Sequence, residues 1–489
     1  MLSDMIKNII FDVKKNKKLF RKISKLLIII FIFLCILIIA SFCFNRNIKQ
    51  SRENQLSHEE VTVDYNFEYK LYSDNESNSK IFSDAIVGAI NSANESIELA
   101  IYSIDIKEII NLLILKKKEG LSVKIVLPEK RRKEVGGYFE NSGVDLIFVG
   151  ESSSEDNNSD LMHHKFLIID SDTENRNIIF GALNFTDYQE KYDSSYIIQT
   201  YDKEIIKSFK NEFVLLAEGI NSVKKLRNNS YKIFSKKINY ENGYIELWFG
   251  PGLENFSVKQ RMIELVSSAK QKINIIAWQF NDKLLFNSLT HMADAAINIK
   301  LISDDMFIWS NLSAIKRTHN MEVLSDAFGN FLIKGRMGLD NTIPTSFNPY
   351  IHYHFMIIDD SVLVTGTNNW GFAGFNLNDE NILVTNISSL VHDFSKIFDF
   401  QYKKNRNTKL NFENIDINTI RINQEVPINS RIVFYIDDTR QKQKTYEVCY
   451  EQVIPDNHEI TFPEYCNREH VLLFIVDDED KLLSSDYLN

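Results

Sequence analysis

Beyond its first 52 residues, the chain is short of basic side chains. Of the 489 residues, 56 are Lys or Arg and 66 are Asp or Glu, and residues 1–52 hold 11 of the basic residues and two of the acidic ones. The remaining 45 basic and 64 acidic residues give the body a net charge of −19. Sequence-independent binding of polyanions needs many Lys and Arg contacts to phosphates. The charge balance therefore argues against a general polyanion-binding body, and leaves room only for a local basic groove.

Cysteine is also scarce, with four residues in the whole chain. Cys35 and Cys43 lie in an apolar run near the N-terminus, which leaves Cys449 and Cys466 in the body. In an extracytoplasmic protein this pair is able to form one disulfide, and two buried free thiols fit the sequence equally well.

Residues 26–44 form an unbroken run of apolar or small residues without a charge, long enough for a helix to cross a bilayer. Seven Lys or Arg residues precede the run within residues 14–25, and three follow it within residues 45–52. A cleaved signal peptide is the alternative, but residues 40–43 fit a cleavage site poorly. The charge bias predicts a single-pass membrane protein with a cytoplasmic basic segment, residues 1–25, and an extracytoplasmic body.

The body alternates strand-like and helical patterns. Residues 97–102 and 123–127 have the short β-rich pattern of strands, and residues 106–118 have the periodicity of an amphipathic helix. This alternation is typical of an α/β protein, with a mixed or parallel sheet flanked by helices.

The second half of the body repeats the first. Residues 92–100 match residues 268–276 in pattern, and residues 121–126 match residues 297–302, both at an offset of 176 without a gap. The repeat predicts a tandem duplication of two α/β domains, followed by a small β-rich domain of short alternating runs. We expect a stalk at residues 45–64, the first repeat at 65–222, a linker at 223–242, the second repeat at 243–406 and the β-rich domain at 407–489.

One polar motif occurs once in each repeat. A histidine comes first, a second polar residue stands two places on, an aspartate follows five places later, and a Gly-x-x-Asn comes after it. The first copy consists of His163, Lys165, Asp170, Gly181 and Asn184, and the second of His352, His354, Asp359, Gly366 and Asn369. The motifs are offset by 189, so the second repeat gains 13 residues, which we expect within residues 335–349.

Residues 166–169 and 355–358 are continuous apolar runs, typical of strands buried on both faces. Alternation then places His163 and Lys165 on one face of their strand, and His352 and His354 on one face of theirs. If the two strands approach each other around a pseudo-twofold axis, these polar faces meet in one site.

Two facing histidines are able to share the work of displacing a phosphodiester. A neutral histidine attacks phosphorus and forms a covalent phosphohistidine, while a protonated one donates to the leaving oxygen. Lys165 would neutralise the phosphate, and Asn184 and Asn369 would donate hydrogen bonds to it. The closing residues Asp170 and Asp359 are expected to support the motif's own structure.

These motifs resemble those of the phospholipase D superfamily, whose signature is His-x-Lys-(x)4-Asp followed by Gly-x-x-Asn, present twice in each active site. The resemblance covers roughly residues 65–405. It implies that His163 is the nucleophile and His352 the general acid, and that no metal or other cofactor is needed. Family members also carry an acidic residue after the asparagine that orients an active-site histidine, and Asp193 and Glu380 are the corresponding candidates. His354 departs from the signature, because it stands where the family has lysine.

A competing interpretation is a metal site built by His163, His164, His352 and His354. A His-x-His pair on a strand does place two imidazoles on one face, as zinc sites require. This interpretation leaves Lys165 and the asparagines without a role, and we expect His164 to point away from the site.

The superfamily includes phospholipases, phospholipid synthases and nucleases. The predicted membrane anchor and the acidic body favour a lipid substrate, so we expect a membrane-anchored phosphodiesterase that acts on phospholipids. A nuclease is the first alternative, because residues 366–370 and 378–381 are similar to the nuclease-like members. A catalytically weak phosphate-binding protein is the second, because His354 lacks the permanent charge of lysine. We therefore expect an enzyme that is slow or prefers mildly acidic pH. Since both motifs lie in one chain, no oligomer is required.

Overall fold

The structure is a computed structural model that describes residues 56–74, 80–150, 161–227, 233–250, 258–278, 280, 282–303, 321–325, 351–407, 412–438, 445–463, 471–476 and 482–488. The basic segment 1–25 and the apolar run 26–44 lie outside these residues. No helix within them is both long and apolar enough to cross a membrane.

The first repeat is built on a seven-stranded sheet with the order β2-β8-β7-β6-β3-β4-β5. Strands β3, β4 and β5 are parallel, and β6 runs antiparallel to β3. In chain order its elements are β2 (Lys70–Ser73), α2 (Ile81–Ser92), β3 (Ser96–Ile101), α3 (Lys107–Lys118), β4 (Ser122–Pro128), η1 (Glu129–Arg131), α4 (Arg132–Val135), η2 (Gly136–Phe139), β5 (Asp145–Val149), β6 (Lys165–Ile169), β7 (Asn177–Gly181), α5 (Asp187–Tyr192), β8 (Tyr196–Thr200), α6 (Lys203–Ala217) and α7 (Ser222–Arg227).

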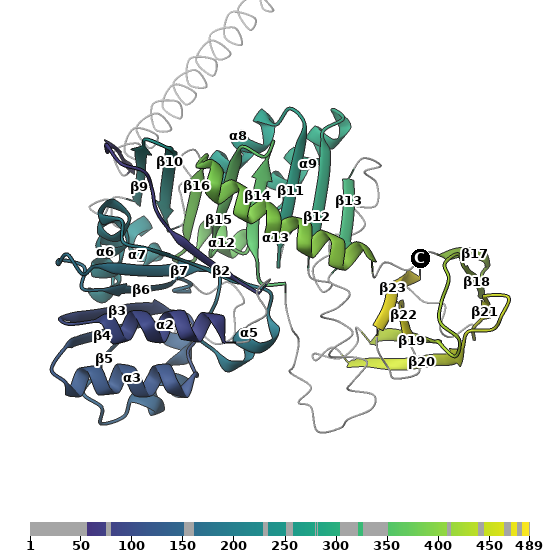
Figure 1. The fold of residues 1–489 in the computed structure, drawn as a ribbon, viewed down its shortest axis with the longest axis horizontal. Coiled ribbons are helices and arrows are strands. Elements are labelled where there is room, and N and C mark those ends of the chain that lie inside the picture. Colours follow the sequence, from purple (N-terminus) through teal and green to yellow (C-terminus); the bar gives the residue numbers. More distant parts are fainter. Residues whose placement is uncertain are drawn as a thin grey trace, which may run out of the picture. The chain divides into compact units, whose positions relative to one another are not determined.

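The second repeat has a nine-stranded sheet with the order β1-β9-β10-β16-β15-β14-β11-β12-β13. Its last seven strands follow the order of the first sheet, and β1 and β9 are additions at one edge (Figure 1). Its elements are β1 (Leu56–Thr62), β9 (Ile233–Tyr240), β10 (Gly243–Phe249), α8 (Val258–Ser268), β11 (Lys272–Ala277), α9 (Lys283–Asp294), β12 (Asn298–Ser303), β13 (Met321–Ser325), β14 (His354–Ile358), β15 (Val362–Gly366), α12 (Phe372–Asn376), β16 (Asn381–Thr385) and α13 (Ser388–Asn407).

The duplication holds element by element. Strands β3 and β11 begin 176 residues apart, as do helices α3 and α9, and the motif strands β6 and β14 begin 189 apart. Strands β5 and β13 still keep the offset of 176, so the 13 additional residues fall between β13 and β14. The segment in which we expected them, 335–349, lies outside the described residues. Strands β7 and β8 match β15 and β16 at an offset of 185.

The two motif strands are buried on both faces, as their apolar runs predicted. One face of β6, with Phe166 and Ile168, packs into the same core as the face of β14 with Phe355 and Ile357. Helices α6 and α13 contribute to this shared core, whereas α2 and α3 cover the opposite face of the first sheet (Figure 1). The fold is therefore a duplicated mixed α/β fold with helix-flanked sheets.

Two segments that we expected to be connectors contain strands. The last part of the expected stalk forms β1, and the expected linker contains β9, which lies between β1 and β10. Residues 223–242 suggested a linker because they are rich in Lys, Asn and Ser, and Lys236 of β9 is one of these residues. This lysine is buried, but its charge is paired, with Nζ 2.5 Å from Glu204 Oε2 and 3.5 Å from Glu59 Oε1.

The glycines of the two Gly-x-x-Asn motifs are required by a close approach of two strands. A Cβ atom on Gly181 would lie 2.9 Å from the Cα of Ile197, and one on Gly366 would lie 2.9 Å from the Cα of Ile382. Both neighbours are backbone atoms of the adjacent strand, which cannot move without breaking the ladder. Any larger residue would push β7 from β8, or β15 from β16.

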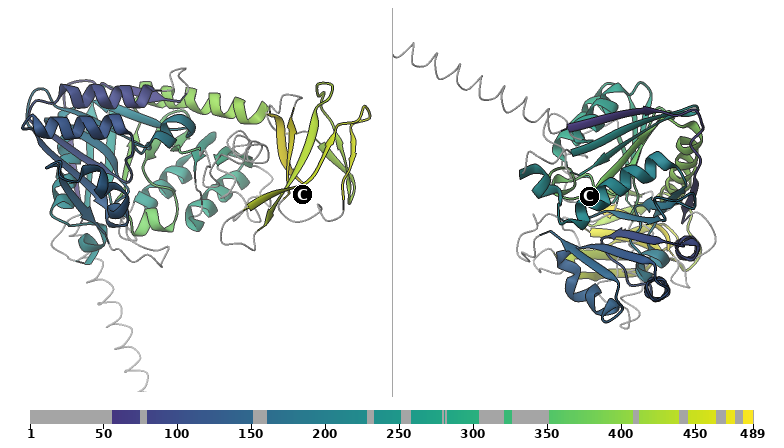
Figure 2. Two further views of the ribbon diagram at one scale, coloured as in Figure 1. Left: turned by 90° about the horizontal axis from the view of Figure 1, so that it is seen from below. Right: turned by 90° about the vertical axis from the view of Figure 1, so that its left-hand side faces the viewer.

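The C-terminal region forms two sheets, with the orders β17-β18-β21 and β20-β19-β22-β23 (Figure 2, left). Side chains of both sheets, including Ile420 and Phe434, share one apolar core, as in a sandwich. Cys449 is disulfide-bonded, and Cys466 lies outside the described residues. The strands are β17 (Phe412–Asp416), β18 (Thr419–Ile422), β19 (Arg431–Asp438), β20 (Thr445–Val453), β21 (Glu459–Thr461), β22 (Val471–Val476) and β23 (Leu482–Leu488).

Candidate active site

The two motifs meet through reciprocal contacts at the N-terminal ends of β6 and β14. Met162, just before the first motif, forms a β-bridge with Asp379 of the second repeat, and Ile351, just before the second motif, forms one with Ser194 of the first. Each repeat thus holds the start of the other's motif. His163, Lys165, His352 and His354 are all buried, and Lys165 and His163 act electrostatically on both His352 and His354, so these four side chains form a cluster inside the protein.

The closing aspartates support the backbone, as we expected. Asp170 accepts hydrogen bonds from the backbone N–H groups of residues 94–96 at 2.8–2.9 Å. Asp359 accepts the same three bonds from residues 270–272 at 2.8–3.0 Å. Both residues have left-handed backbone angles, φ 48° and 50°, which aspartate tolerates better than most residues. Each carboxylate therefore ties the end of a motif strand to the start of β3 or β11.

His163 is held by a carboxylate from the other repeat. Its Nδ1 donates to Glu380 Oε2 at 2.9 Å, which leaves the lone pair on Nε2. Glu380 is 2% exposed, and it also accepts from the Thr367 hydroxyl at 2.6 Å and from the Asn378 amide at 3.0 Å. Burial lowers the pKa of His163 below its usual value, and the charge of Glu380 opposes this shift. Orientation and tautomer of His163 are thus fixed by side chains of the second repeat.

Lys165 lies beside the free nitrogen of His163. Its Nζ is 3.2 Å from His163 Nε2 and donates to the His163 carbonyl at 2.9 Å. The residue is 1% exposed, and burial lowers its pKa to about 7, with Glu380 opposing the shift. An anion next to this ammonium group would raise its pKa again, because opposite charges favour the charged form.

The second pair of side chains has fewer partners. The rings of His352 and His354 pack edge to face at 5.2 Å. Among the described residues, Nδ1 of His352 and both ring nitrogens of His354 have no hydrogen-bond partner. Burial lowers the pKa of both imidazoles well below the usual value, and the nearby Lys165 and His163 lower it further. Both rings are therefore neutral at pH 7 in the ligand-free site.

The counterpart of Glu380 is Ser195, not Asp193. Glu380 immediately precedes β16 and Ser195 immediately precedes β8, and these strands correspond without a gap. Asp193 instead corresponds to Asn378. We had matched the two acids by residue type, although they lie at different distances from the strand that follows each of them. Nδ1 of His352 has no hydrogen-bond partner among the described residues, so no carboxylate holds His352 as Glu380 holds His163.

A glutamine absent from the sequence prediction contacts His352. Gln189 of α5 accepts the backbone N–H of Asn184 through Oε1 at 2.6 Å, and its Nε2 lies 3.5 Å from His352 Nε2. The corresponding position in the second repeat is Gly374. The side-chain Oδ1 atoms of Asn184 and Asn369, which are acceptors, have no partner among the described residues.

Each histidine also has an aromatic neighbour at an equivalent position. Tyr102, directly after β3, lies edge to face against His163 at 5.2 Å between ring centres. Trp278, directly after β11, lies 5.6 Å from His352. Neither aromatic residue nor Gln189 carries a sequence signal of its own, and the offset of 176 relates Tyr102 to Trp278 only once His163 and His352 are known. Thr367 and Asn378 lie in segments that the resemblance singled out, but their contacts with Glu380 were not predicted.

His164 points away from the cluster, as expected. Its Nε2 is 3.2 Å from Glu212 Oε1 and its Nδ1 is 3.1 Å from the Asn381 amide. Both ring nitrogens are thus occupied by structural contacts. Within the described part of the chain, no three His, Cys, Asp or Glu side chains lie together as ligands of a metal ion would. The competing four-histidine arrangement is therefore wrong.

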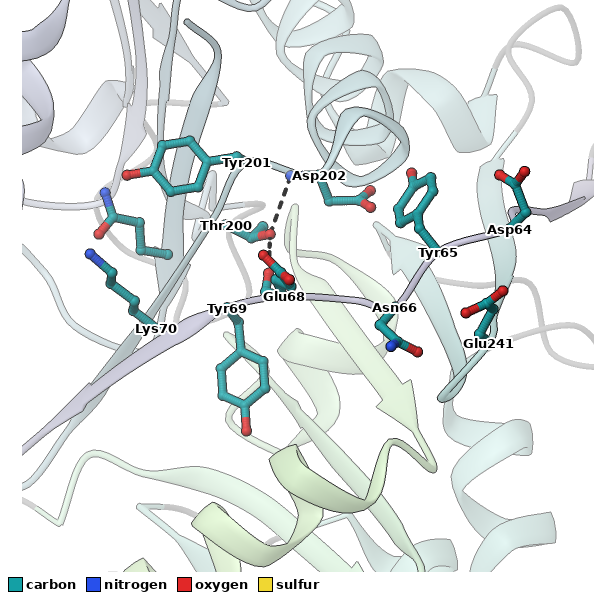
Figure 3. Close-up of a pocket in the computed structure, with 11 residues that line it drawn as sticks. Asp64, Tyr65, Asn66, Glu68, Tyr69, Lys70, Thr200, Tyr201, Asp202 and Glu241 are labelled. Carbon is teal, nitrogen blue, oxygen red and sulfur yellow. Dashed lines mark hydrogen bonds between the residues drawn. The ribbon is translucent and has the colours of Figure 1, made fainter. Parts of the chain in front are cut away.

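A separate groove of about 640 Å³ lies along β2 and the end of β8 (Figure 3). Four carboxylates and one lysine line it, so it favours cations over phosphates. The Thr200 hydroxyl in this groove donates to the Glu68 carbonyl at 2.7 Å and accepts the Asp202 N–H at 3.2 Å. The lining residues are Asp64, Tyr65, Asn66, Glu68, Tyr69, Lys70, Gln199, Thr200, Tyr201, Asp202 and Glu241, and no motif residue is among them.

Comparison with known proteins places this site in a family. A family model described as "Cardiolipin synthase, PLD-like domain" matches residues 86–216 and 262–401, more than half of the chain. The chain is 28% identical over 131 residues to the mitochondrial cardiolipin hydrolase of Danio rerio, a match that covers 26% of this chain and 53% of that protein. It is 25% identical over 150 residues to the protein of the same name from Xenopus tropicalis, covering 30% of this chain and 63% of the relative.

The chain therefore spans less than two thirds of the length of either relative. Among solved structures, a phosphatidylserine synthase from Haemophilus influenzae superimposes with a TM-score of 0.53 at 13% identity, covering 73% of this chain and 90% of that one. This likeness shows a common fold. With the family match on both repeats, it follows that the chain belongs to the phospholipase D superfamily.

Proposed function

We propose that the protein is a phospholipase D-like phosphodiesterase that hydrolyses phospholipids through a covalent phosphohistidine. The observation that carries this proposal is the junction of the two motifs, where His163 with its Glu380 partner and Lys165 lies in one buried cluster with His352. Both half-sites belong to one chain, so a monomer suffices.

His163 is the proposed nucleophile. His352 is neutral in the ligand-free site, and the bound phosphate anion raises its pKa so that it takes up a proton. The Nε2 lone pair of His163 then attacks phosphorus, and the bond from phosphorus to the leaving oxygen breaks as His352 gives that oxygen its proton. Glu380 accepts the hydrogen bond from Nδ1–H throughout and stabilises the positive charge on the phosphorylated ring. In the second step His352 takes a proton from water, the water oxygen attacks phosphorus, and Nε2 of His163 leaves.

Lys165 is proposed to bind the phosphate and to release the nucleophile. In the ligand-free site its ammonium group lies against Nε2, the atom that must attack. A phosphodiester oxygen offers Lys165 an anionic acceptor in place of Nε2, and this exchange frees the lone pair. Asn184, Asn369 and His354 are proposed to complete the phosphate contacts, and Asp193 to support the site.

A lipid is the proposed substrate. The relatives named cardiolipin hydrolase and the structural neighbour named phosphatidylserine synthase point to phospholipid chemistry. The net charge of −19 outside residues 1–52 disfavours general binding of nucleic acid. We also propose that residues 26–44 anchor the body next to its substrate, with the N-terminus in the cytoplasm.

The test is a side-by-side assay of the full chain in detergent micelles on labelled phospholipid and on single-stranded DNA. We expect lipid hydrolysis that falls by at least about 10⁴-fold in His163→Ala, because a nucleophile cannot be replaced by its neighbours. A labelled diester should leave a phosphohistidine at His163. DNA cleavage without lipid cleavage would identify a nuclease, and the absence of any covalent intermediate would identify a phosphate-binding protein without turnover.

A further inference from the structure

A basic turn lies at the same edge of the first sheet as His163. Residues 130–133 read Lys-Arg-Arg-Lys and follow the C-terminal end of β4, in a body that is otherwise acidic. Strands β3 and β4 are parallel, and β6 is antiparallel to β3, so the ends of β3 and β4 meet the start of β6 at one edge. Ligands of such sheets bind beyond the carboxyl ends of the parallel strands.

Tyr102 connects this turn to the histidine cluster. The guanidinium carbon of Arg131 lies 4.8 Å from the centre of the Tyr102 ring, and the ammonium group of Lys130 lies 5.5 Å from it. The same ring contacts His163 at 5.2 Å and has the Lys165 ammonium 5.8 Å from its centre. Positive charge therefore continues from Lys165 to Arg131 around one aromatic side chain.

Arg131 and Arg132 are held by different partners. Nε of Arg131 is buried without a hydrogen-bond partner in the described structure, and one terminal nitrogen pairs with Glu134 at 2.5 Å. Arg132 instead holds Glu129 with two bonds at 2.6 and 2.8 Å and stacks over Phe148 at 4.2 Å. The two arginines thus share a turn and a charge but differ in place: Arg131 lies over Tyr102 beside the histidine cluster, and Arg132 lies over Phe148.

The basic turn belongs to the first repeat alone. In the second repeat the residues that follow β12 in the sequence are Asp304 and Asp305. The aromatic position is kept as Trp278, so the duplication preserved the ring and not the cations. This asymmetry places any additional anion on the His163 side of the cluster.

We propose that Arg131, with Lys130 and Tyr102, forms a subsite for a second phosphate of the substrate, next to the phosphate that His163 attacks. This inference rests on the proposed function and narrows the substrate class to phospholipids that carry two phosphodiesters joined by a short linker. One basic turn provides a single additional anion site, whereas a polynucleotide needs a series of them. Arginine suits the role because its planar donors match two phosphate oxygens at once.

The experiment compares two water-soluble headgroups. Bis(glycerophospho)glycerol has two phosphodiesters joined through one glycerol, and glycerophosphoglycerol has one. Their binding to the full chain in detergent is measured by calorimetry in a His163→Ala background, which prevents turnover. We expect the two-phosphate probe to bind about tenfold more tightly, the effect of one good charged contact. Arg131→Gln should remove this preference, and Arg132→Gln, the matched control, should keep it.

The inference is overturned if neither probe binds, if they bind equally, or if the two arginine variants behave alike. Hydrolysis of both probes by the chain with His163 intact is measured separately, and it distinguishes failure of the subsite from failure of the proposed function. A protein that hydrolyses both probes at one rate and shows no binding preference retains the function and loses the subsite. A protein that shows the Arg131-dependent preference but hydrolyses neither the probes nor labelled phospholipid retains the subsite and loses the function.

Discussion

His163 and His352 occupy the same position in two copies of one fold, yet they meet different surroundings. His163 has a carboxylate on one ring nitrogen and an ammonium group at the other. His352 has a neutral imidazole, His354, two residues on and no hydrogen-bond partner on Nδ1 among the described residues. The backbone supports of the two motifs, Asp170 and Asp359, have by contrast stayed the same.

The difference has a physical reason. Two buried lysines and two histidines in one cluster would repel one another and lose hydration, both of which are costly. His354 carries no charge in the ligand-free cluster, so the second half-site holds no cation for a carboxylate to balance, and Ser195 stands at the position equivalent to Glu380. The duplicated site has thus divided into a charged half and a neutral half, and the divided roles of nucleophile and acid fit this asymmetry.

The largest difference between the two half-sites is expected at Glu380, the carboxylate that holds His163. Glu380→Gln keeps the size of the side chain but removes the charge that orients His163, so we expect kcat/KM to fall by about 10²–10³-fold. Ser195→Ala at the equivalent position should change it by less than about twofold. Steady-state kinetics of both variants, with Glu380→Asp as a conservative rescue, measures this. Equal losses in the two variants would show that the halves depend on these positions alike.

The next effect concerns pH. Because burial and three cationic or titratable neighbours hold the pKa of His354 well below its usual value, it gains a charge only as pH falls. A bound phosphate anion raises the pKa of His354, so the enzyme–substrate complex should gain this charge, and kcat should rise, as pH falls from 7.5 towards mildly acidic values. His354→Lys should raise kcat/KM at pH 7.5 by about tenfold, because a lysine beside a bound phosphate stays charged.

His354→Gln is the matched control for this prediction, since glutamine cannot gain a charge. We expect it to remove the rise in activity at acidic pH without improving the rate at pH 7.5. The pH–rate profiles of the three proteins decide the matter. If His354→Lys leaves both the rate and the profile unchanged, the neutral half-site has no bearing on turnover.

Much of the site was predictable because its residues repeat at fixed offsets. The pairs His163 with His352 and Asp170 with Asp359 could be found from the sequence, and so could the burial of β6 and β14. Gln189 could not, because its role depends on the Asn184 N–H that fixes its amide. The counterpart of Glu380 was assigned wrongly because residue type was given more weight than distance to the next strand.

Local sequence patterns predicted some elements of the fold and missed others. The helix and strands predicted between residues 97 and 127 agree with β3, α3 and β4 within about one residue at each end. Strand β9 was missed because a strand with a buried lysine has the composition of a linker. Only the distant partners Glu204 and Glu59, which no local pattern reveals, make that burial possible.

The smallest expected difference is at the closing aspartates, where the two halves should behave alike. Burial acts to raise the pKa of Asp170 and Asp359, but backbone N–H donors outweigh it and hold both pKa values below the usual range. Their stabilisation is therefore present above the unfolded-state pKa of about 3.9 and is lost as pH falls through the lower folded-state value. Asp170→Asn and Asp359→Asn should each reduce the free energy of unfolding by about 1–2 kcal/mol at pH 7, since asparagine tolerates the left-handed backbone but loses the charged hydrogen bonds.

Asp360→Asn is the control, because Asp360 has the same backbone conformation but makes an exposed ion pair with Lys272. Denaturant unfolding at pH 7 and pH 3 measures these effects, and a loss that persists undiminished at pH 3 would contradict the electrostatic explanation.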